Sequence, residues 1–110
     1  MFGELQPVPD GDPIPLTGVR LRVGRRSDCD VVLPYPGVSS HHCLMELDEG
    51  YWYVKDLNSR NGMKIDGIRI PPGAKRRVNP RERISFGKYE YVLDYEPSDL
   101  GAQGLPISGR

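Results

Sequence analysis

The stretch that decides the fold is Val38-Ser39-Ser40-His41-His42-Cys43, which lies between two other polar stretches of the chain. The upstream one is Gly24-Arg25-Arg26-Ser27, and the downstream one is Asp56-Leu57-Asn58-Ser59-Arg60-Asn61-Gly62. All three combine short polar side chains or turn-forming residues, and all are bordered by short apolar or alternating runs typical of strands. We therefore expect three loops that connect strands of one domain.

These loops supply the groups that bind a phosphate. A phosphorylated side chain carries nearly two negative charges and three strong acceptor oxygens. Its binding site needs a planar cation, short hydroxyl donors and free backbone N–H groups. Arg25, Ser39, Ser40 and the Asn61-Gly62 turn provide them, and all lie outside the predicted strands. The sequence therefore indicates a phosphate-binding rim made of loops.

The size and composition of the chain set broad limits. Its 110 residues suffice for one domain with one core. The formal net charge is zero, so overall charge favours no class of partner. The 11 prolines and 13 glycines are normal for a domain of short strands and many turns.

The sequence also indicates the compartment. No run approaches the roughly 20 apolar residues of a membrane span. Met1-Phe2-Gly3-Glu4 lacks the basic and apolar regions of a signal peptide. We expect a cytoplasmic protein in which both thiols, Cys29 and Cys43, are reduced and partly buried.

Upstream of the deciding stretch, the pattern predicts short strands. Phe2–Val8 is expected to be an edge strand, because Pro7 and Pro9 cannot donate to a ladder. Val19, Leu21 and Val23 alternate with arginines, which predicts a half-buried strand that ends at Gly24. A short buried strand, Val31-Val32-Leu33, follows and is stopped by Pro34.

Two structures compete over residues 38–49. This run is long enough for a helix, contains good helix formers, and precedes Gly50 as a possible C-cap. Against the helix, Cys43, Met45 and Leu47 alternate with their neighbours. A second alternating run, Tyr51–Lys55, follows a tight turn, as a hairpin requires. We favour the hairpin.

Downstream, the turn chemistry is clearer. Asp66-Gly67 between two apolar runs is the strongest hairpin pattern in the chain. The alternation of Tyr89–Tyr95 predicts a strand, and residues 97–110 are expected to form a flexible C-terminal tail. Together the runs predict an all-β fold, an antiparallel β-sandwich of about 9–11 short strands.

Three motifs, in order and at close to the family's spacing, resemble the forkhead-associated (FHA) domain family. They are Gly24-Arg25, the Ser-x-x-His motif from Ser39 to His42, and the Asp-Leu-x-Ser-x-Asn-Gly motif from Asp56 to Gly62. The resemblance covers about residues 4–96, so we expect an FHA domain at 1–96 with the FHA/SMAD-like sandwich. It implies a module that binds phosphothreonine peptides in Ser/Thr kinase signalling, with no enzymatic activity and no cofactor.

The resemblance also implies roles for individual residues. Arg25 and Ser39 would bond the phosphate, and Asn61 would bond the peptide main chain beside the phosphothreonine. His42 would stabilise the loops by hydrogen bonds, while Gly24 and Gly62 would permit their backbone paths. A small apolar slot would receive the γ-methyl group of the phosphothreonine.

Some positions depart from the family pattern. Ser40 stands where the family often has Arg or Asn, which shortens the reach of this position. Arg60 stands where many members have Thr, and it adds a cation at the edge of the predicted site. Gly37 stands where some members have an arginine that recognises the third residue after the phosphothreonine. By that route the sequence gives no support for an acidic residue there.

Metal binding and catalysis are the alternatives at the central stretch. The adjacent His41 and His42 point in opposite directions on extended backbone, and the usual zinc spacings are missing. Ser39 and His42 lack a nucleophile elbow and a third orienting group. We therefore expect no metal site and no catalytic residues.

Two further readings involve surfaces away from the loops. The basic run Lys75–Arg83 would suit nucleic acid, but zero net charge and the lack of interleaved aromatics make nucleic acid an unlikely partner. A scaffold that binds partners through one sandwich face, without phosphate, stays open as the alternative function. The sequence names neither the partner nor the kinase, and it leaves the oligomeric state unknown.

Overall fold

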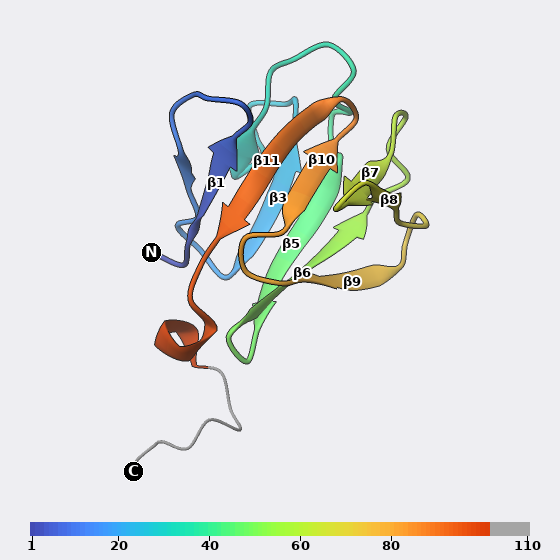
Figure 1. The fold of residues 1–110 in the computed structure, drawn as a ribbon. Coiled ribbons are helices and arrows are strands. Elements are labelled where there is room, and N and C mark those ends of the chain that lie inside the picture. The colour runs from blue at the N-terminus through green and yellow to red at the C-terminus, as the bar shows by residue number, and fades with distance from the viewer. Residues whose placement is uncertain (102–110) are drawn as a thin grey trace.

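The computed structural model describes residues 1–101. These residues form two β-sheets that pack face to face (Figure 1). In spatial order, the first sheet contains β2 (Ile14–Pro15), β1 (Glu4–Pro7), β11 (Tyr89–Asp94), β10 (Arg83–Phe86), β7 (Met63–Ile65) and β8 (Ile68–Arg69). The second contains β4 (Val31–Val32), β3 (Arg20–Gly24), β5 (Cys43–Asp48), β6 (Tyr51–Asp56) and β9 (Lys75–Val78). The predicted β-sandwich is confirmed, with one parallel pair, β3 and β4, among the described strands.

The core lies between the sheets because alternate residues of each strand point inward. On β6, Trp52 and Val54 are buried, whereas Tyr51 and Tyr53 face outward. The indole N–H of Trp52 donates to the carbonyl of Phe2 (2.8 Å), which satisfies its polar atom inside the core. The largest fully buried side chains include Trp52, Phe86, Leu5, Leu16, Leu33, Met45, Met63, Ile84 and Leu93.

The hairpin over residues 43–56 is confirmed, and the competing helix is wrong. β5 and β6 pair along their whole lengths, from Cys43 opposite Asp56 to Asp48 opposite Tyr51. The connecting turn uses Glu49 and Gly50, both with positive φ (50° and 87°). Pairing buries Met45 and Trp52 on the inner face, and this tertiary burial outweighs the local helix propensity.

The Asp66-Gly67 hairpin is confirmed, since it joins β7 to β8 with positive φ at both turn residues (49° and 79°). The edge position expected for Phe2–Val8 is wrong. β1 lies between β11 and the two-residue strand β2, with Glu4 opposite Pro15. Pro7 is tolerated because it stands at the last paired position, opposite Tyr91.

After β11 the chain forms a short 3₁₀-helix, η1 (Pro97–Leu100), with Pro97 buried. These are the first residues of the predicted tail 97–110, and they pack on the sandwich through Leu100. Residues 102–110 lie outside the described part of the chain. The boundary of the domain at residue 96 therefore stays a prediction.

The topology brings the three polar stretches to one end of the sandwich. The chain leaves β3 and enters β5 at this end, and it also leaves β6 and turns from β10 to β11 there (Figure 1). η1 and the β5–β6 turn lie at the opposite end (Figure 1). Segments far apart in sequence thus meet at one rim.

Candidate functional site

The rim contains an open depression of about 370 Å³. Four of the five predicted binding residues line it together. The fifth predicted residue, Asn61, lines an adjacent depression instead. The complete lining is Arg25, Gly37, Val38, Ser39, Ser40, Asn58 and Arg60. Sequence reasoning missed the lining roles of Gly37, Val38 and Asn58, which only loop geometry reveals.

Backbone hydrogen bonds fasten the loop after β3 to the central stretch. The Arg25 N–H donates to the Ser39 carbonyl (2.9 Å), and the His42 N–H donates to the Val23 carbonyl (2.8 Å). The two chains approach so closely that a Cβ on Gly24 would lie 2.1 Å from the Ser40 carbonyl oxygen. Glycine at position 24 is therefore required by contact and fixes the place of Arg25.

The hydroxyl of Ser39 is oriented by the third loop. Its Oγ accepts a hydrogen bond from the Arg60 N–H (2.9 Å). Because this bond uses a lone pair, the hydroxyl proton remains available for a second acceptor. Ser39 can therefore donate into the depression.

His42 connects the same two loops from below. It is fully buried, and its Nδ1 accepts a hydrogen bond from the Ser39 N–H (3.0 Å). Its Nε2 lies 3.0 Å from the Gly62 carbonyl oxygen, which can only accept. The two contacts together require the neutral tautomer with the proton on Nε2. The imidazole ring also packs edge-to-face against Phe86, with 5.8 Å between the ring centroids.

The loop from Asp56 to Gly62 is stabilised by its own side chains. The carboxylate of Asp56 accepts from the Ser59 N–H (2.9 Å), and the Ser59 hydroxyl accepts from the Gly62 N–H (3.1 Å). The side-chain amide of Asn61 donates to the Gly37 carbonyl (2.8 Å), which closes the rim against the central stretch. Asn61 keeps its amide oxygen and its second N–H for other partners.

The electrostatics of the depression favour an anion. Arg25 and Arg60 are exposed, and neither guanidinium forms an ion pair with an acidic group among residues 1–101. Two free planar cations and two serine hydroxyls surround one opening. Such a donor set matches an anion with several acceptor oxygens.

A second basic depression, of about 600 Å³, borders the first and shares Gly37 with it. Its cations are Lys64 of β7, Arg69 of β8 and Lys88 of the β10–β11 turn. No ion pair within the described chain involves these three side chains. Sequence reasoning missed this group because its members come from three segments with no common spacing.

The guanidinium of Arg69 lies against the backbone of the third loop at Gly62. A Cβ on Gly62 would lie 3.0 Å from one guanidinium nitrogen of Arg69. The arginine side chain could shift to relieve this contact, so the reason that favours glycine here is the positive φ of Gly62 (77°). The cation of Arg69 lies next to the Asn61-Gly62 turn.

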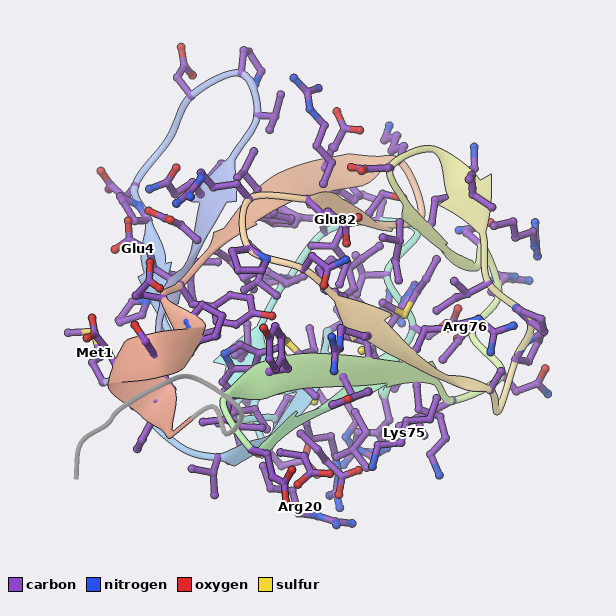
Figure 2. All side chains as sticks on the ribbon, turned by 60° about the horizontal axis from the view of Figure 1, so that its bottom comes forward. Met1, Glu4, Arg20, Lys75, Arg76 and Glu82 are labelled. Carbon is purple, nitrogen blue, oxygen red and sulfur yellow. The ribbon has the colours of Figure 1, made fainter. Side chains whose placement is uncertain are left out.

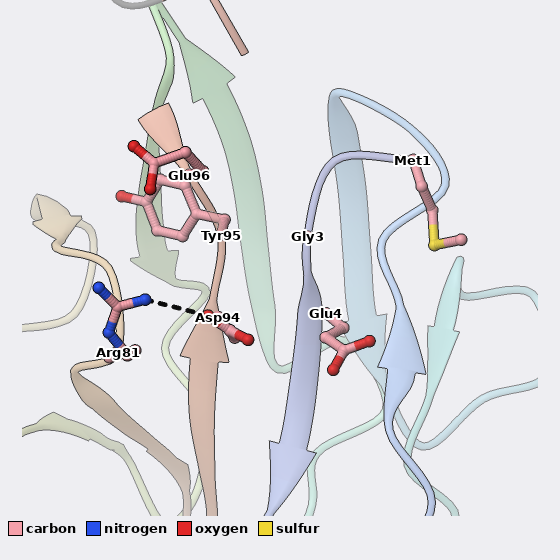
Figure 3. Close-up of a pocket in the computed structure, with 7 residues that line it drawn as sticks. All are labelled: Met1, Gly3, Glu4, Arg81, Asp94, Tyr95 and Glu96. Carbon is pink, nitrogen blue, oxygen red and sulfur yellow. Dashed lines mark hydrogen bonds and ion pairs between the residues drawn. The ribbon is translucent and has the colours of Figure 1, made fainter. Parts of the chain in front are cut away.

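A depression near the N-terminus has the opposite character. It lies at the η1 end, and Figure 3 shows the carboxylates of Glu4, Asp94 and Glu96 around it. Arg81, the basic side chain in its lining, donates to Asp94 (3.5 Å). This end of the molecule would repel a phosphate.

The basic run Lys75–Arg83 is mostly paired within the protein. Arg77 lies over the ring of Tyr51 (3.9 Å to the centroid), and Lys75 approaches Glu46 (3.8 Å). Arg83 pairs with Glu90 (3.0 Å). Lys75 and Arg76 project from the edge of the sandwich in Figure 2. Because Arg77 covers an aromatic face, this surface is poorly suited to stacking nucleobases.

The family comparison agrees with this geometry. A profile described as the FHA domain matches residues 21–87, which contain all three loops. This chain belongs to the FHA domain family. FHA domains are interaction modules. Within residues 1–101, no helix has the length and apolar character to cross a bilayer.

Similar proteins include regulators from distant organisms. The FHA domain here is 34% identical over 92 residues to mediator of DNA damage checkpoint protein 1 of Mus musculus, covering 78% of this chain and 5% of that protein. It is 39% identical over 98 residues to the transcriptional regulatory protein EmbR of Mycobacterium tuberculosis, covering 88% of this chain and 24% of EmbR. The chain thus spans a small part of these relatives.

A solved structure of EmbR from Mycobacterium tuberculosis, in complex with a low-affinity phosphopeptide, superimposes with a TM-score of 0.77. The sequence identity in this superposition is 26%, and it covers 96% of this FHA domain and 26% of the EmbR chain.

Proposed function

We propose that this FHA domain binds phosphothreonine peptides and acts downstream of a Ser/Thr kinase, as a binding module rather than an enzyme. The observation that carries the proposal is the shared depression, in which Arg25, Ser39, Ser40 and Arg60 face one opening. The phosphopeptide in the EmbR structure supports it.

In the proposed mechanism, preformed loops capture the phosphate without chemical change. Arg25 donates two parallel hydrogen bonds, Ser39 and Ser40 donate their hydroxyls, and Arg60 adds a second cation. Val38 is the apolar side chain in the lining, but it is buried in the core, so it could meet the γ-methyl group that distinguishes threonine from serine only at the floor of the depression. Asn61 binds the peptide main chain beside the phosphothreonine.

Calorimetric titration with a degenerate phosphothreonine peptide library tests this mechanism. Wild-type affinity is expected near the micromolar range, about −8 kcal/mol. Arg25→Ala should weaken binding by about 10- to 150-fold, because a charge-assisted hydrogen bond contributes about 1.5–3 kcal/mol. Arg76→Ala, at the exposed edge of β9, is the matched control and should bind like wild type.

Peptides with unphosphorylated threonine should not bind, and phosphoserine peptides should bind more weakly. Equal binding by wild type and Arg25→Ala, or no binding by wild type to any phosphopeptide, would contradict the proposed function. Because four residues share the depression, Ser39→Ala and Arg60→Ala should each weaken binding less than Arg25→Ala.

We also propose that the peptide carries an acidic residue near the phosphothreonine. A chain bound by Asn61 would continue into the second depression, which is lined by three cations that form no ion pair within residues 1–101. Gly37 stands where some family members have an arginine that recognises the third residue after the phosphothreonine, so that route offers no support for an acidic preference. Here Lys64, Arg69 and Lys88 would provide the charge from other elements.

A peptide series with aspartate placed at successive positions on each side of the phosphothreonine tests this preference. Extended residues rise about 3.3 Å each, so a favoured position is expected within about four residues. The best peptide should bind at least about fivefold more tightly than its alanine form, from several exposed pairs of 0.2–1 kcal/mol each. Lys64→Ala combined with Lys88→Ala should remove this gain, whereas Lys55→Ala on β6 should not.

The scaffold alternative predicts exposed apolar residues on one sheet face. Within the described chain, the exposed large hydrophobic residues are scattered along the sequence: Met1, Val19, Val32, Tyr35, Leu57 and Ile68. This distribution does not favour a single docking face. We propose a cytoplasmic location, supported by two free cysteines, Cys29 and Cys43.

A further inference from the structure

Folding brings three metal-ligating side chains together behind the phosphate-binding rim. Asp28 and Cys29 lie in the loop between β3 and β4, and His41 lies just before β5. Their ligand atoms all lie within 4.8 Å of one another. His41 Nε2 stands 3.4 Å from a carboxylate oxygen of Asp28. The cluster is separate from His42, which points into the core.

The donor set is chemically specific. A thiolate, an imidazole nitrogen and a carboxylate oxygen are the three ligand types that Zn²⁺ uses, and together they disfavour the hard ions Mg²⁺ and Ca²⁺. Three protein ligands leave one tetrahedral position for water or another donor. The sequence argument against zinc rested on the spacing of neighbouring residues, whereas this cluster joins residues 28–29 with residue 41.

The interactions that a metal would replace are weak. Asp28 contacts Arg26 at 3.7 Å, but both side chains are more than half exposed, so this pair contributes little. The Cys29 thiol donates to the Ser40 carbonyl at 3.3 Å, a weak bond for sulfur.

We propose that Asp28, Cys29 and His41 bind Zn²⁺, and that the ion tightens the phosphate-binding rim. The ion would join the loop that carries Arg25 to the segment that carries Ser39 and Ser40, next to the existing backbone bonds between them. Ordering these loops before the peptide binds reduces the entropy lost on binding, so zinc should raise phosphopeptide affinity. This coupling rests on the proposed function, but zinc binding itself does not.

Cobalt substitution tests the site without any peptide. Tag-free, reduced protein is titrated with Co²⁺ and then with Zn²⁺ while the thiolate-to-cobalt absorption is recorded. The wild type should develop the absorption up to one equivalent and lose it when zinc is added. Cys29→Ser should lack the band, and Cys43→Ala should retain it, because Cys43 is fully buried in β5 and is not one of the three clustered ligands.

An absent cobalt band in wild type, or a band that persists in Cys29→Ser, would overturn the zinc site. His41→Ala and Asp28→Asn should each weaken zinc at least about tenfold by calorimetry, a loss of about 1.4 kcal/mol or more. Arg26→Ala removes the partner of Asp28 but no ligand, so it should bind zinc at least as tightly as wild type. Circular dichroism melts check that each variant is folded.

The coupling is measured by phosphopeptide titration with zinc and with a chelator. Zinc should raise wild-type affinity about three- to tenfold and should leave Cys29→Ser unchanged. A cobalt band without any change in peptide affinity would overturn the coupling and keep the metal site. A protein that binds zinc but no phosphopeptide under either condition would contradict the proposed function instead.

Discussion

At the scale of single residues, His42 is the most constrained polar side chain of the rim. It is fully buried, and its two nitrogens bond backbone groups of two different loops, the Ser39 N–H and the Gly62 carbonyl. Buried polar groups of the backbone are costly to leave without partners. One imidazole therefore fixes Ser39, the serine that we propose to donate to phosphate, relative to the Asn61-Gly62 turn.

His42→Ala should lower the free energy of unfolding by about 2–4 kcal/mol, since it leaves a cavity and two backbone groups without partners. Urea denaturation measures this loss. His41→Ala, measured with a chelator present, is the matched control, because His41 is half-exposed and should change stability by less than about 0.5 kcal/mol. Equal losses in the two variants would contradict the structural role of His42.

At the scale of elements, the loop between β6 and β7 depends on the residue that ends β6. Asp56 is buried, with one carboxylate oxygen accepting from the Ser59 N–H and the other, Oδ2, without a hydrogen-bond partner in the described chain. Its backbone carbonyl also accepts from Gly73 (2.8 Å). The loop that presents Arg60 and Asn61 is thus anchored from the end of a core strand.

Asp56→Ala should destabilise the fold by about 1–3 kcal/mol, because it leaves the Ser59 N–H without an acceptor. It should also weaken phosphopeptide binding about threefold or more at a temperature where the protein stays folded, since Arg60 and Asn61 lose their anchor. Asp56→Asn keeps an acceptor oxygen and should lose less in both measurements. Unchanged peptide affinity in the folded Asp56→Ala protein would show that the loop is ordered by other contacts.

At the scale of the whole molecule, one continuous core encloses several ionisable groups. Burial raises the pKa of Cys43 far above its ordinary value, and it also raises the pKa values of Tyr91 and Tyr95. The Tyr95 hydroxyl donates to the Val78 carbonyl and accepts from the backbone N–H of Trp52 (3.3 Å), which joins the two sheets. These groups stay protonated in the folded chain at pH values where the unfolded chain ionises.

Stability should therefore fall as the pH rises above about 9, the ordinary pKa of a cysteine thiol. Above this pH the unfolded chain releases protons that the folded chain keeps, so each such group lowers the free energy of unfolding by up to about 1.4 kcal/mol per pH unit. Below pH 8 these groups should have no effect on stability. Urea denaturation across this range measures the slope.

Cys43→Ala tests whether the Cys43 thiol contributes to alkaline unfolding. The quantity to compare is the slope of the free energy of unfolding against pH, because the absolute free energy also reflects lost packing. Its alkaline slope should be shallower than that of wild type by nearly the contribution of one group. Cys29→Ala should change the slope less, because Cys29 is the less deeply buried thiol. Equal slopes in wild type and Cys43→Ala would show that other groups control alkaline unfolding.

The sequence by itself determined the local features of this protein. Alternation along Tyr51–Asp56 and Tyr89–Asp94 identifies strands because side chains on extended backbone point to opposite faces. The Asp66-Gly67 pair identifies a hairpin because its turn needs two residues with positive φ. Motif order then indicated the FHA fold and five candidate binding residues, of which four line one depression.

Only the tertiary structure decided the features that depend on residues far apart in the chain. Sheet pairing, rather than local propensity, made residues 43–48 a strand and placed β1 inside its sheet. The basic depression of Lys64, Arg69 and Lys88 and the cluster of Asp28, Cys29 and His41 have no pattern in sequence. Their members are adjacent because the strands end at the same rim, and strand order is fixed by burial of the whole core.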